Sequence, residues 1–237
     1  MTQRKTLNQL FDTLGYEFKN INLIQTALTH SSYANESKGK VEFNERLEFL
    51  GDSVLGLTVS DYLYRTYPEL SEGVLSKLRA KVVSEVSLAQ KARELNLGEY
   101  LRLGRGEDNI GGRNRASVLA DAMESVIGAI YLDGGMETAR SFVLKLMVPV
   151  IESYAAGKGP QDYKTDLQEY LQSRSSLEIT YRIINEEGPD HDKWFTAQVL
   201  HGDKPIGQGQ GKSKKEAEQQ AAKLALSMLT GNKEYEQ

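Results

Sequence analysis

The stretch NERLEFLGDS, residues 44–53, determines most of what this chain is expected to form. Wound as a helix at about 100° per residue, it places Glu45, Glu48 and Asp52 within an arc of roughly 60°. The apolar side chains predicted for the opposite, core-facing side are Leu47, Leu50, Val54 and Leu57. The pattern therefore predicts an amphipathic helix whose polar face carries closely spaced carboxylates.

Two residues of this stretch do not suit a solvated helix surface. Gly51 lies inside the helical pattern, where glycine costs about 1 kcal/mol relative to alanine. Phe49 lies on the acidic face, where its ring would be exposed to water. Both residues predict close packing against another body. We expect that body to be the same helix of a second copy, with Phe49 and Gly51 in the interface of a homodimer.

A second stretch, VLADAMESVIGAIYLD at residues 118–133, repeats this design. Asp121 and Glu124 are three residues apart and share a helix face, where like charges repel by roughly a few tenths of a kcal/mol. The residues expected to face the core are Met123, Val126, Ile127 and Ile130. A hard divalent cation between the two acidic faces would remove the repulsion, and oxygen ligands favour Mg²⁺, with Mn²⁺ as a substitute. Either stretch alone is also compatible with a solvated acidic surface.

Outside these stretches the chain divides near AAGKGPQ, residues 155–161, which is rich in small residues. We expect a helical domain over residues 1–154, a linker over 155–161 and a second domain over 162–231. The first domain is predicted to be all-α, because apolar residues recur at three- and four-residue spacing. The helical segments expected there are Leu23–Thr29, Val41–Tyr67, Leu75–Leu95, Ala116–Leu132 and Glu137–Tyr154.

The second domain has an α+β pattern in the order α-β-β-β-α. A helix is predicted over Tyr163–Gln172, and alternating apolar residues predict strands around 179–183, 195–199 and 204–210. The last helix is predicted over Ser213–Leu229. Its apolar stripe is expected to consist of Ala217, Ala221, Leu224, Ala225 and Met228.

Composition excludes several classes of protein. The 237 residues include 39% hydrophobic and 26% charged residues, a balance typical of folded domains. There is no cysteine, which excludes disulfide frameworks and thiolate metal sites. No apolar run is long enough to span a membrane, and the N-terminal residues lack the apolar core of a signal peptide. We therefore expect a cytoplasmic protein without membrane association.

The motifs taken together resemble those of the ribonuclease III family in its small bacterial form. NERLEFLGDS resembles the family signature, VLADAMESVIGAIYLD resembles the family's second acidic stretch, and LIQTALTHSSYAN is similar to its N-terminal portion. The segments DYKTDLQEYLQ, GPDHDKWF and GQGKSKKEAEQQAA are similar to a double-stranded RNA-binding domain. The resemblance covers nearly the whole chain and implies an endonuclease domain followed by that RNA-binding domain.

The resemblance also implies roles for individual acids. Glu48, Asp121 and Glu124 match the family's metal ligands, and Asp52 matches an acid needed for cleavage, so that Asp52 and Glu124 are the expected catalytic residues. Glu45 and Glu72 match further acids of the cleavage valley, and the resemblance is the basis for Glu72. Phe49 matches a residue that inserts into a socket of the partner subunit.

The RNA contacts are not predicted by bulk charge, since residues 162–231 carry nine Lys and Arg against eleven Asp and Glu. The lysines cluster instead around a helix start that Ser213 and Glu216 are expected to fix as a capping box, an arrangement that favours phosphate binding. By resemblance, the minor-groove contacts come from the first helix and from a loop between strands. The expected RNA-binding residues are Thr165, Gln168, Glu169, Pro189, Asp190, His191, Lys212, Ser213, Lys214 and Lys215.

These expectations combine into a Mg²⁺-dependent endoribonuclease that hydrolyses both strands of double-stranded RNA as a homodimer and uses no organic cofactor. By resemblance its products carry 5′-phosphate and 3′-hydroxyl ends with short 3′ overhangs. Ribosomal RNA precursors, with some messenger and transfer RNA precursors, are the implied substrates. Two alternatives stay open: a protein that binds double-stranded RNA without cleaving it, and a Mg²⁺-dependent helical phosphohydrolase acting on nucleotides.

Overall fold

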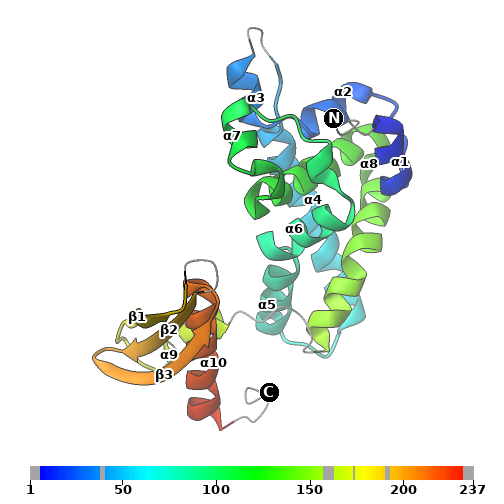
Figure 1. Cartoon of the computed structure of the whole chain (residues 1–237). Coiled ribbons are helices and arrows are strands. Elements are labelled where there is room, and N and C mark those ends of the chain that lie inside the picture. The colour runs from blue at the N-terminus through cyan, green and yellow to red at the C-terminus, as the bar shows by residue number, and fades with distance from the viewer. Residues whose placement is uncertain (1–5, 38–40, 157–162, 173, 190–192, 232–237) are drawn as a thin grey trace. The chain divides into compact units, whose positions relative to one another are not determined.

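The computed structural model describes residues 6–37, 41–156, 163–172, 174–189 and 193–231. The chain divides into two compact units, residues 1–159 and 160–237 (Figure 1). The expected linker falls across this division, and its residues 157–161 lie outside the described part of the chain.

The first unit is built from helices, as predicted. Ser84 begins α6 by accepting a hydrogen bond from the backbone N–H of Ser87, so the single helix expected over Leu75–Leu95 is in fact two, α5 and α6. Three short helices, α1, α3 and α7, were not predicted. The helices are α1 (Leu7–Leu14), α2 (Ile21–Ala27), α3 (Ser31–Glu36), α4 (Glu45–Thr66), α5 (Glu72–Val82), α6 (Glu85–Glu94), α7 (Arg105–Asn109) and α8 (Ala116–Ala155), with 3₁₀ turns at Leu97–Glu99 and Gly112–Asn114.

The long helix α8 changes direction at Gly135, where φ is 80° and ψ is 176°. Such a positive φ is readily adopted by glycine and strains other residues. The kink separates the two helical segments predicted on either side of it, and helical α8 backbone resumes before Glu137. No helix among the described residues is long and apolar enough to cross a membrane.

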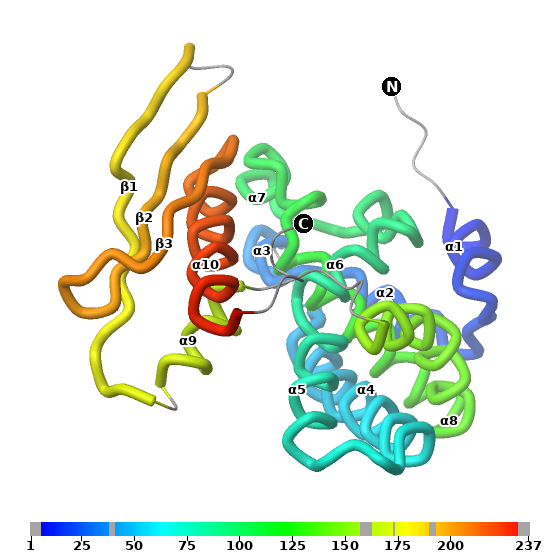
Figure 2. The backbone as a smooth tube through the Cα atoms, turned by 90° about the horizontal axis from the view of Figure 1, so that it is seen from below, coloured from blue at the N-terminus to red at the C-terminus, as the bar shows by residue number. Residues whose placement is uncertain are grey.

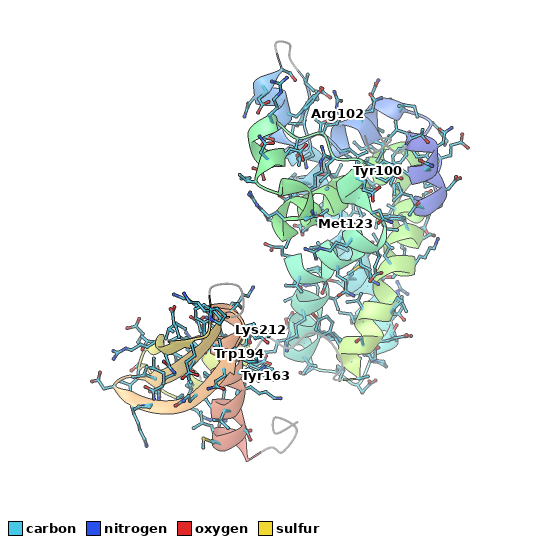
Figure 3. All side chains as sticks on the ribbon, viewed as in Figure 1. Tyr100, Arg102, Met123, Tyr163, Trp194 and Lys212 are labelled. Atoms are coloured by element: carbon cyan, nitrogen blue, oxygen red, sulfur yellow. The ribbon has the colours of Figure 1, made fainter. Side chains whose placement is uncertain are left out.

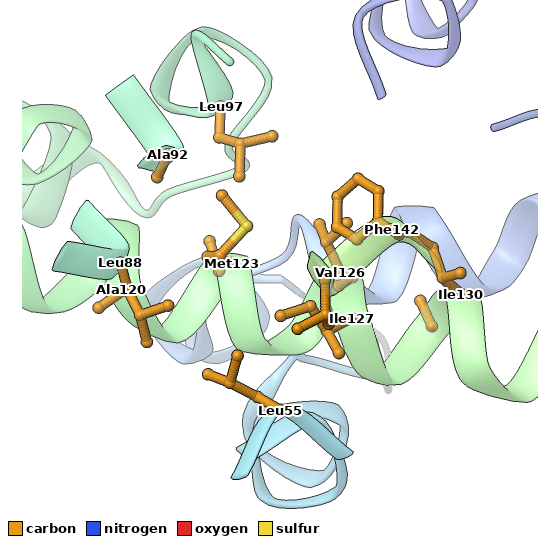
Figure 4. Close-up of a cluster of buried hydrophobic side chains, with 14 of the residues drawn as sticks. Leu55, Leu88, Ala92, Leu97, Ala120, Met123, Val126, Ile127, Ile130 and Phe142 are labelled. Carbon is orange, nitrogen blue, oxygen red and sulfur yellow. The ribbon is translucent and has the colours of Figure 1, made fainter. Parts of the chain in front are cut away.

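The core of this unit lies between α4, α6 and α8. Figure 4 shows that the central part of α8 supplies side chains toward both neighbours. The six side chains of this cluster that are named next are each at most 1% exposed. The cluster includes Leu55 of α4, Leu88 and Ala92 of α6, and Met123, Val126 and Ile127 of α8.

The predicted core-facing side of α4 is confirmed at Leu47 and Val54, which are buried, but not at Leu57 and Leu50. Leu57 is 62% exposed, not buried, and Leu50 is half-buried. Farther along α4, the side of the helix that begins with the acids carries apolar residues instead. Leu55, Val59 and Leu63 follow Glu48 by seven, eleven and fifteen residues, and all three are buried. Of the three acids of α4, Glu48 is half-buried beside this packed row, whereas Glu45 and Asp52 are exposed. The side with Phe49 and Leu57 is exposed to solvent.

The second unit has the predicted α-β-β-β-α order. Its elements are α9 (Tyr163–Gln172), β1 (Ile179–Glu187), β2 (Trp194–His201), β3 (Lys204–Gly211) and α10 (Lys214–Thr230). The strands form an antiparallel sheet in the order β1-β2-β3. In Figure 2 the strands run side by side and α10 packs along the sheet.

Close packing joins β3 to α10. Alternate glycines of β3 face the helix, and a Cβ on Gly209 would collide with the backbone nitrogen of Ala221. Since this contact needs small residues on both sides, the buried row of α10 consists chiefly of alanines. The predicted stripe is wrong at Leu224 and Met228, which are 41% and 70% exposed. The buried apolar residues of α10 are Ala217, Ala221, Ala222, Ala225 and Leu226.

Replacing Gly209 with alanine is expected to destabilise the second unit by about 1–3 kcal/mol, because the added methyl forces β3 and α10 apart. Gln208→Ala is the matched control, since Gln208 is exposed on the same strand. Thermal unfolding of both variants in the full-length protein measures the effect. Equal melting curves for the two variants would contradict the close contact.

Candidate metal centre and RNA-binding surface

Three carboxylates from two helices meet in the first unit. Glu48 of α4 and Asp121 and Glu124 of α8 each place a carboxylate oxygen within 4.8 Å of the other two. All three side chains are half-buried. Oxygen ligands gathered in this way from rigid helices suit a hard divalent cation. The arrangement confirms that the two acidic stretches meet, and we call these three residues the carboxylate triad.

The triad can form because α4 and α8 approach closely. A Cβ on Gly51 would collide with the backbone carbonyl of Glu124, and a Cβ on Gly128 would collide with the carbonyl of Leu47. Gly51 is buried in this contact. The expectation that Gly51 faces a second copy is therefore wrong: the close packing that its position indicated is against α8 of the same chain.

A buried hydrogen bond fixes the register of the two helices at the same level. The Ser125 hydroxyl, next to Glu124, donates to the carbonyl oxygen of Asn44 at 3.2 Å. That carbonyl also accepts the first helical bond of α4, from the N–H of Glu48 at 2.9 Å. The turn of α8 that carries Glu124 is thus tied to the turn of α4 that carries Glu48.

The charges of the triad oppose one another. The pKa of Glu124 is raised to about 8, chiefly because burial disfavours its charged form. The carboxylates of Asp52, Glu48 and Asp121 raise it in the same direction. Burial likewise raises the pKa of Glu48 and of Asp121. A group that is costly to ionise alone becomes favourable to ionise beside a dication, so the donor set fits a metal ion.

The raised pKa predicts how stability depends on pH without metal. Glu124 titrates near 4.5 when unfolded and near 8 when folded, so its stabilising contribution is complete below about pH 4.5 and is lost as pH rises through 8. In EDTA, the melting temperature of the wild type is expected to fall relative to that of Glu124→Gln between pH 5.5 and 8.5. If the difference in melting temperature between the wild type and Glu124→Gln stays constant over this pH range, the raised pKa of Glu124 is contradicted.

The other predicted acids lie at different places. Glu45 and Asp52 are exposed on α4, and their charges contribute to the raised pKa of Glu48. Glu72 is the first residue of α5, and its Oε1 accepts a hydrogen bond from the Ser76 hydroxyl at 2.8 Å. Its charge is not among the causes that shift the triad. Within this unit alone, Glu72 is not brought to the triad.

Two residues near Asp121 were missed by the sequence reasoning. The charge of His30 lowers the pKa of Asp121 and that of Glu85 raises it, each against the larger effect of burial. His30 is held before α3 by a 2.8 Å contact between its Nδ1 and the Ser32 hydroxyl. Both residues belong to segments other than the two acidic stretches, and no spacing within those stretches could have indicated them.

Not every acid of the second stretch serves the triad. Asp133 accepts hydrogen bonds from the Tyr16 hydroxyl at 2.7 Å and from the backbone N–H groups of Lys19 and Asn20, each at 2.9 Å. It therefore fixes the connection between α1 and α2 to α8. Its role is structural.

Comparison with known proteins adds to this geometry. Residues 20–151 match a family described as ribonuclease-III-like, and residues 163–229 match the double-stranded RNA binding motif. The ribonuclease 3 of Desulforamulus reducens is 52% identical over 230 residues, which cover 97% of this chain and 94% of that protein. That of Clostridium tetani is 47% identical over 236 residues and covers 100% of both chains. The chain belongs to the ribonuclease III family.

A solved structure agrees with the match of the first unit. The nuclease domain of ribonuclease III from Campylobacter jejuni is 45% identical, with a TM-score of 0.57, and the match covers 61% of this chain and 97% of that one. Membership of the ribonuclease III family makes the protein an endoribonuclease specific for double-stranded RNA. This decides among the three functions that the sequence left open.

In this ribonuclease III the residues expected to contact RNA are exposed wherever the structure describes them. Thr165, Gln168 and Glu169 lie on α9, and Pro189 follows β1. Asp190 and His191 lie outside the described residues. The remaining expected contacts are at the start of α10: Lys212, Ser213, Lys214 and Lys215, all exposed.

The start of α10 is capped much as predicted. The Ser213 hydroxyl accepts a hydrogen bond from the N–H of Glu216 at 3.1 Å. The Glu216 carboxylate, however, accepts from the N–H of Lys212 at 2.8 Å, one residue before the position that a capping box uses. The helix start is therefore fixed, and its lysines project from a defined point next to the sheet.

Proposed function

We propose that this ribonuclease III is a Mg²⁺-dependent enzyme, with Mn²⁺ as a substitute, that cuts both strands of double-stranded RNA. The products carry 5′-phosphate and 3′-hydroxyl ends with short 3′ overhangs, and the substrates are ribosomal RNA precursors with some messenger and transfer RNA precursors. The observation that carries the metal assignment is the carboxylate triad, whose oxygens lie within 4.8 Å of one another.

In this proposal the triad holds the metal and a further acid handles the proton. A bound Mg²⁺ supplies an acidified water and charge stabilisation for the phosphoryl oxygens. Asp52 lies four residues after Glu48 on the same face of α4 and is exposed. This position supports a role in accepting a proton from the attacking water. The water oxygen would form the new bond to phosphorus as the bond to the 3′ oxygen breaks, and the 3′ oxygen would take a proton from solvent to become the 3′-hydroxyl.

We infer that the enzyme acts as a homodimer through the exposed apolar side of α4 and its neighbour α5. Phe49, Leu57 and Tyr64 of α4 are 78%, 62% and 75% exposed, and Val74 of α5 is 46% exposed. At about 100° per residue, Phe49, Leu57 and Tyr64 lie within an arc of roughly 80°. Several large apolar side chains exposed on one side of a helix favour a protein partner. The structure from Campylobacter jejuni was itself described for flexibility in a region involved in dimer formation.

The dimer explains how both strands are cut. Each subunit contributes one triad, so that two sites related by a two-fold axis face the two strands. By resemblance, Glu72 reaches the cleavage valley near that axis, and Glu45 lines it. The RNA-binding unit increases the affinity for double-stranded RNA through α9 and the lysines of α10. Their contacts with phosphates and 2′-hydroxyl groups recognise the shape of A-form RNA.

A cleavage assay tests the metal assignment. A perfect RNA duplex is incubated with the full-length protein in Mg²⁺, in Ca²⁺ or in EDTA, and the products are separated on a gel. Short duplex products in Mg²⁺ and an intact duplex in EDTA are expected. Equal cleavage in EDTA would overturn the role of the triad as a metal site.

A further inference from the structure

A glutamate lies among the lysines of the RNA-binding surface. Glu186 is near the end of β1 and pairs with Phe195 of β2 in the sheet register. Its Oε1 is 3.1 Å from the Nζ of Lys214, and its Oε2 is 3.9 Å from the Nζ of Lys193. One carboxylate thus contacts lysines from two different elements, the first turn of α10 and the residue before β2.

Lys214 and the nearby Lys212 also contact aromatic rings of β2. The Nζ of Lys214 lies 5.6 Å from the centre of the Phe195 ring. The Nζ of Lys212 lies 5.6 Å from the centre of the Trp194 ring, and Figure 3 shows these two side chains together at one end of the sheet. These cation–π contacts hold the ammonium groups beside the sheet whether or not Glu186 is charged. The position of Lys214 therefore does not depend on the glutamate alone.

A carboxylate and an RNA phosphate are competing acceptors for the same ammonium group. The side chain of Lys214 is 60% exposed and that of Glu186 is 39% exposed, so an approaching phosphate can reach Lys214 and will meet the carboxylate as well. If the phosphate displaces Glu186, the ion pair is lost; if both remain, two negative charges lie side by side. In either case the glutamate opposes binding.

We propose that Glu186 sets the affinity of this enzyme for double-stranded RNA by competing with a backbone phosphate for Lys214. The proposal rests on the phosphate contact of Lys214 given under the proposed function. Glu186 thereby lowers the affinity of the RNA-binding unit for double-stranded RNA, and removing its charge strengthens binding. A residue that only braced Lys214 in place would have the opposite effect when removed.

The test compares Glu186→Gln with Glu187→Gln in the full-length protein. Both variants remove one negative charge at adjacent positions. The Glu187 carboxylate, however, accepts a hydrogen bond from the Asn185 amide at 2.6 Å. Dissociation constants for a perfect RNA duplex are measured in EDTA over a series of salt concentrations, and circular dichroism verifies that both variants are folded.

Glu186→Gln is expected to tighten binding by about three- to tenfold at low salt, as like-charge repulsion across a solvated interface implies. The salt dependence is expected to steepen by at most about one unit, since the charge of Lys214 is no longer shared with a carboxylate. Glu187→Gln is expected to change affinity by no more than about twofold, because its exposed carboxylate accepts a hydrogen bond from Asn185 and its charge is screened by salt. Equal tightening by both variants, or weaker binding by Glu186→Gln, would overturn the proposal.

Lys214→Gln separates this proposal from the function on which it rests. Lys214→Gln alone is expected to weaken binding, and adding Glu186→Gln to it is expected to give no further gain, because the shared lysine is gone. If Lys214→Gln leaves affinity unchanged, the phosphate contact itself is wrong. If Lys214→Gln weakens binding and Glu186→Gln does not tighten it, the contact stands and the role of Glu186 is refuted.

Discussion

Glu124→Gln is expected to lower the rate of RNA cleavage by about 10³-fold or more while changing duplex binding by less than about twofold. The variant keeps the size of the side chain and removes its charge. The substitution removes one anionic group from the triad, at a buried position next to three other carboxylates. Because Glu124 is on α8 of the helical unit, the exposed lysines of α10 remain available to RNA.

Single-turnover cleavage of a labelled duplex in Mg²⁺ measures the rate, and filter binding in EDTA measures affinity. Glu137→Gln is the matched control, because Glu137 is an exposed acid on the same helix and is not part of the triad. The control is expected to cleave at the rate of the wild type. Cleavage by Glu124→Gln within about tenfold of the wild-type rate would show that the triad is not the catalytic metal site.

Phe49→Ala is expected to weaken the homodimer by about 10²- to 10⁴-fold. A phenylalanine side chain contributes about 1.5–3 kcal/mol when it is fully buried. A two-fold interface contains the residue twice, so the total is about 3–6 kcal/mol. Phe49 is 78% exposed in the single chain, which leaves nearly all of its surface available for a partner subunit.

Sedimentation equilibrium of the full-length protein measures the dimer dissociation constant. Ile110→Ala is the control, since Ile110 is a large apolar residue that is 68% exposed and follows α7, away from the α4 surface. The control is expected to remain as dimeric as the wild type. If both variants dimerise like the wild type, the exposed side of α4 is not the interface.

The two acidic faces could be predicted because each is encoded within one stretch, whereas the choice of Glu48, Asp121 and Glu124 as ligands came from the resemblance to the ribonuclease III family. The spacings Glu48 to Asp52 and Asp121 to Glu124 follow the helical period, so each acidic face can be read from one stretch. The contact between the two faces was predicted because a cation bound between them would remove the repulsion of their carboxylates. The structure confirms the meeting of Glu48, Asp121 and Glu124.

The errors in predicting packed residues have one cause. Periodicity shows which side of a helix is apolar, but it does not show what that side packs against. Gly51 was correctly identified as a close contact, yet a helical pattern does not distinguish α8 of the same chain from a second copy. Leu57 and Met228 were assigned to the core for their hydrophobicity, and both are exposed. An apolar side chain reserved for a partner looks like a core side chain in the sequence.

The second unit was easier to predict, because its period changes from that of a helix to that of a strand and back again. The alternation at Ile179, Tyr181 and Ile183, and again at Phe195, Ala197 and Val199, coincides with β1 and β2. The contact between Glu186 and Lys214 could not be predicted in this way. It depends on how the end of β1 lies relative to the start of α10, which only the folded sheet defines.

The carboxylate triad also has a topological consequence. Its ligands come from α4 and α8, and more than seventy residues separate Glu48 from Asp121 along the chain. A cation bound there acts as a reversible cross-link that closes this long loop and favours the folded chain over the unfolded one. The melting temperature of the RNA-free protein therefore serves as a gauge of metal occupancy, and a titration of Mg²⁺ or Mn²⁺ against it can rank metals before any RNA is cut.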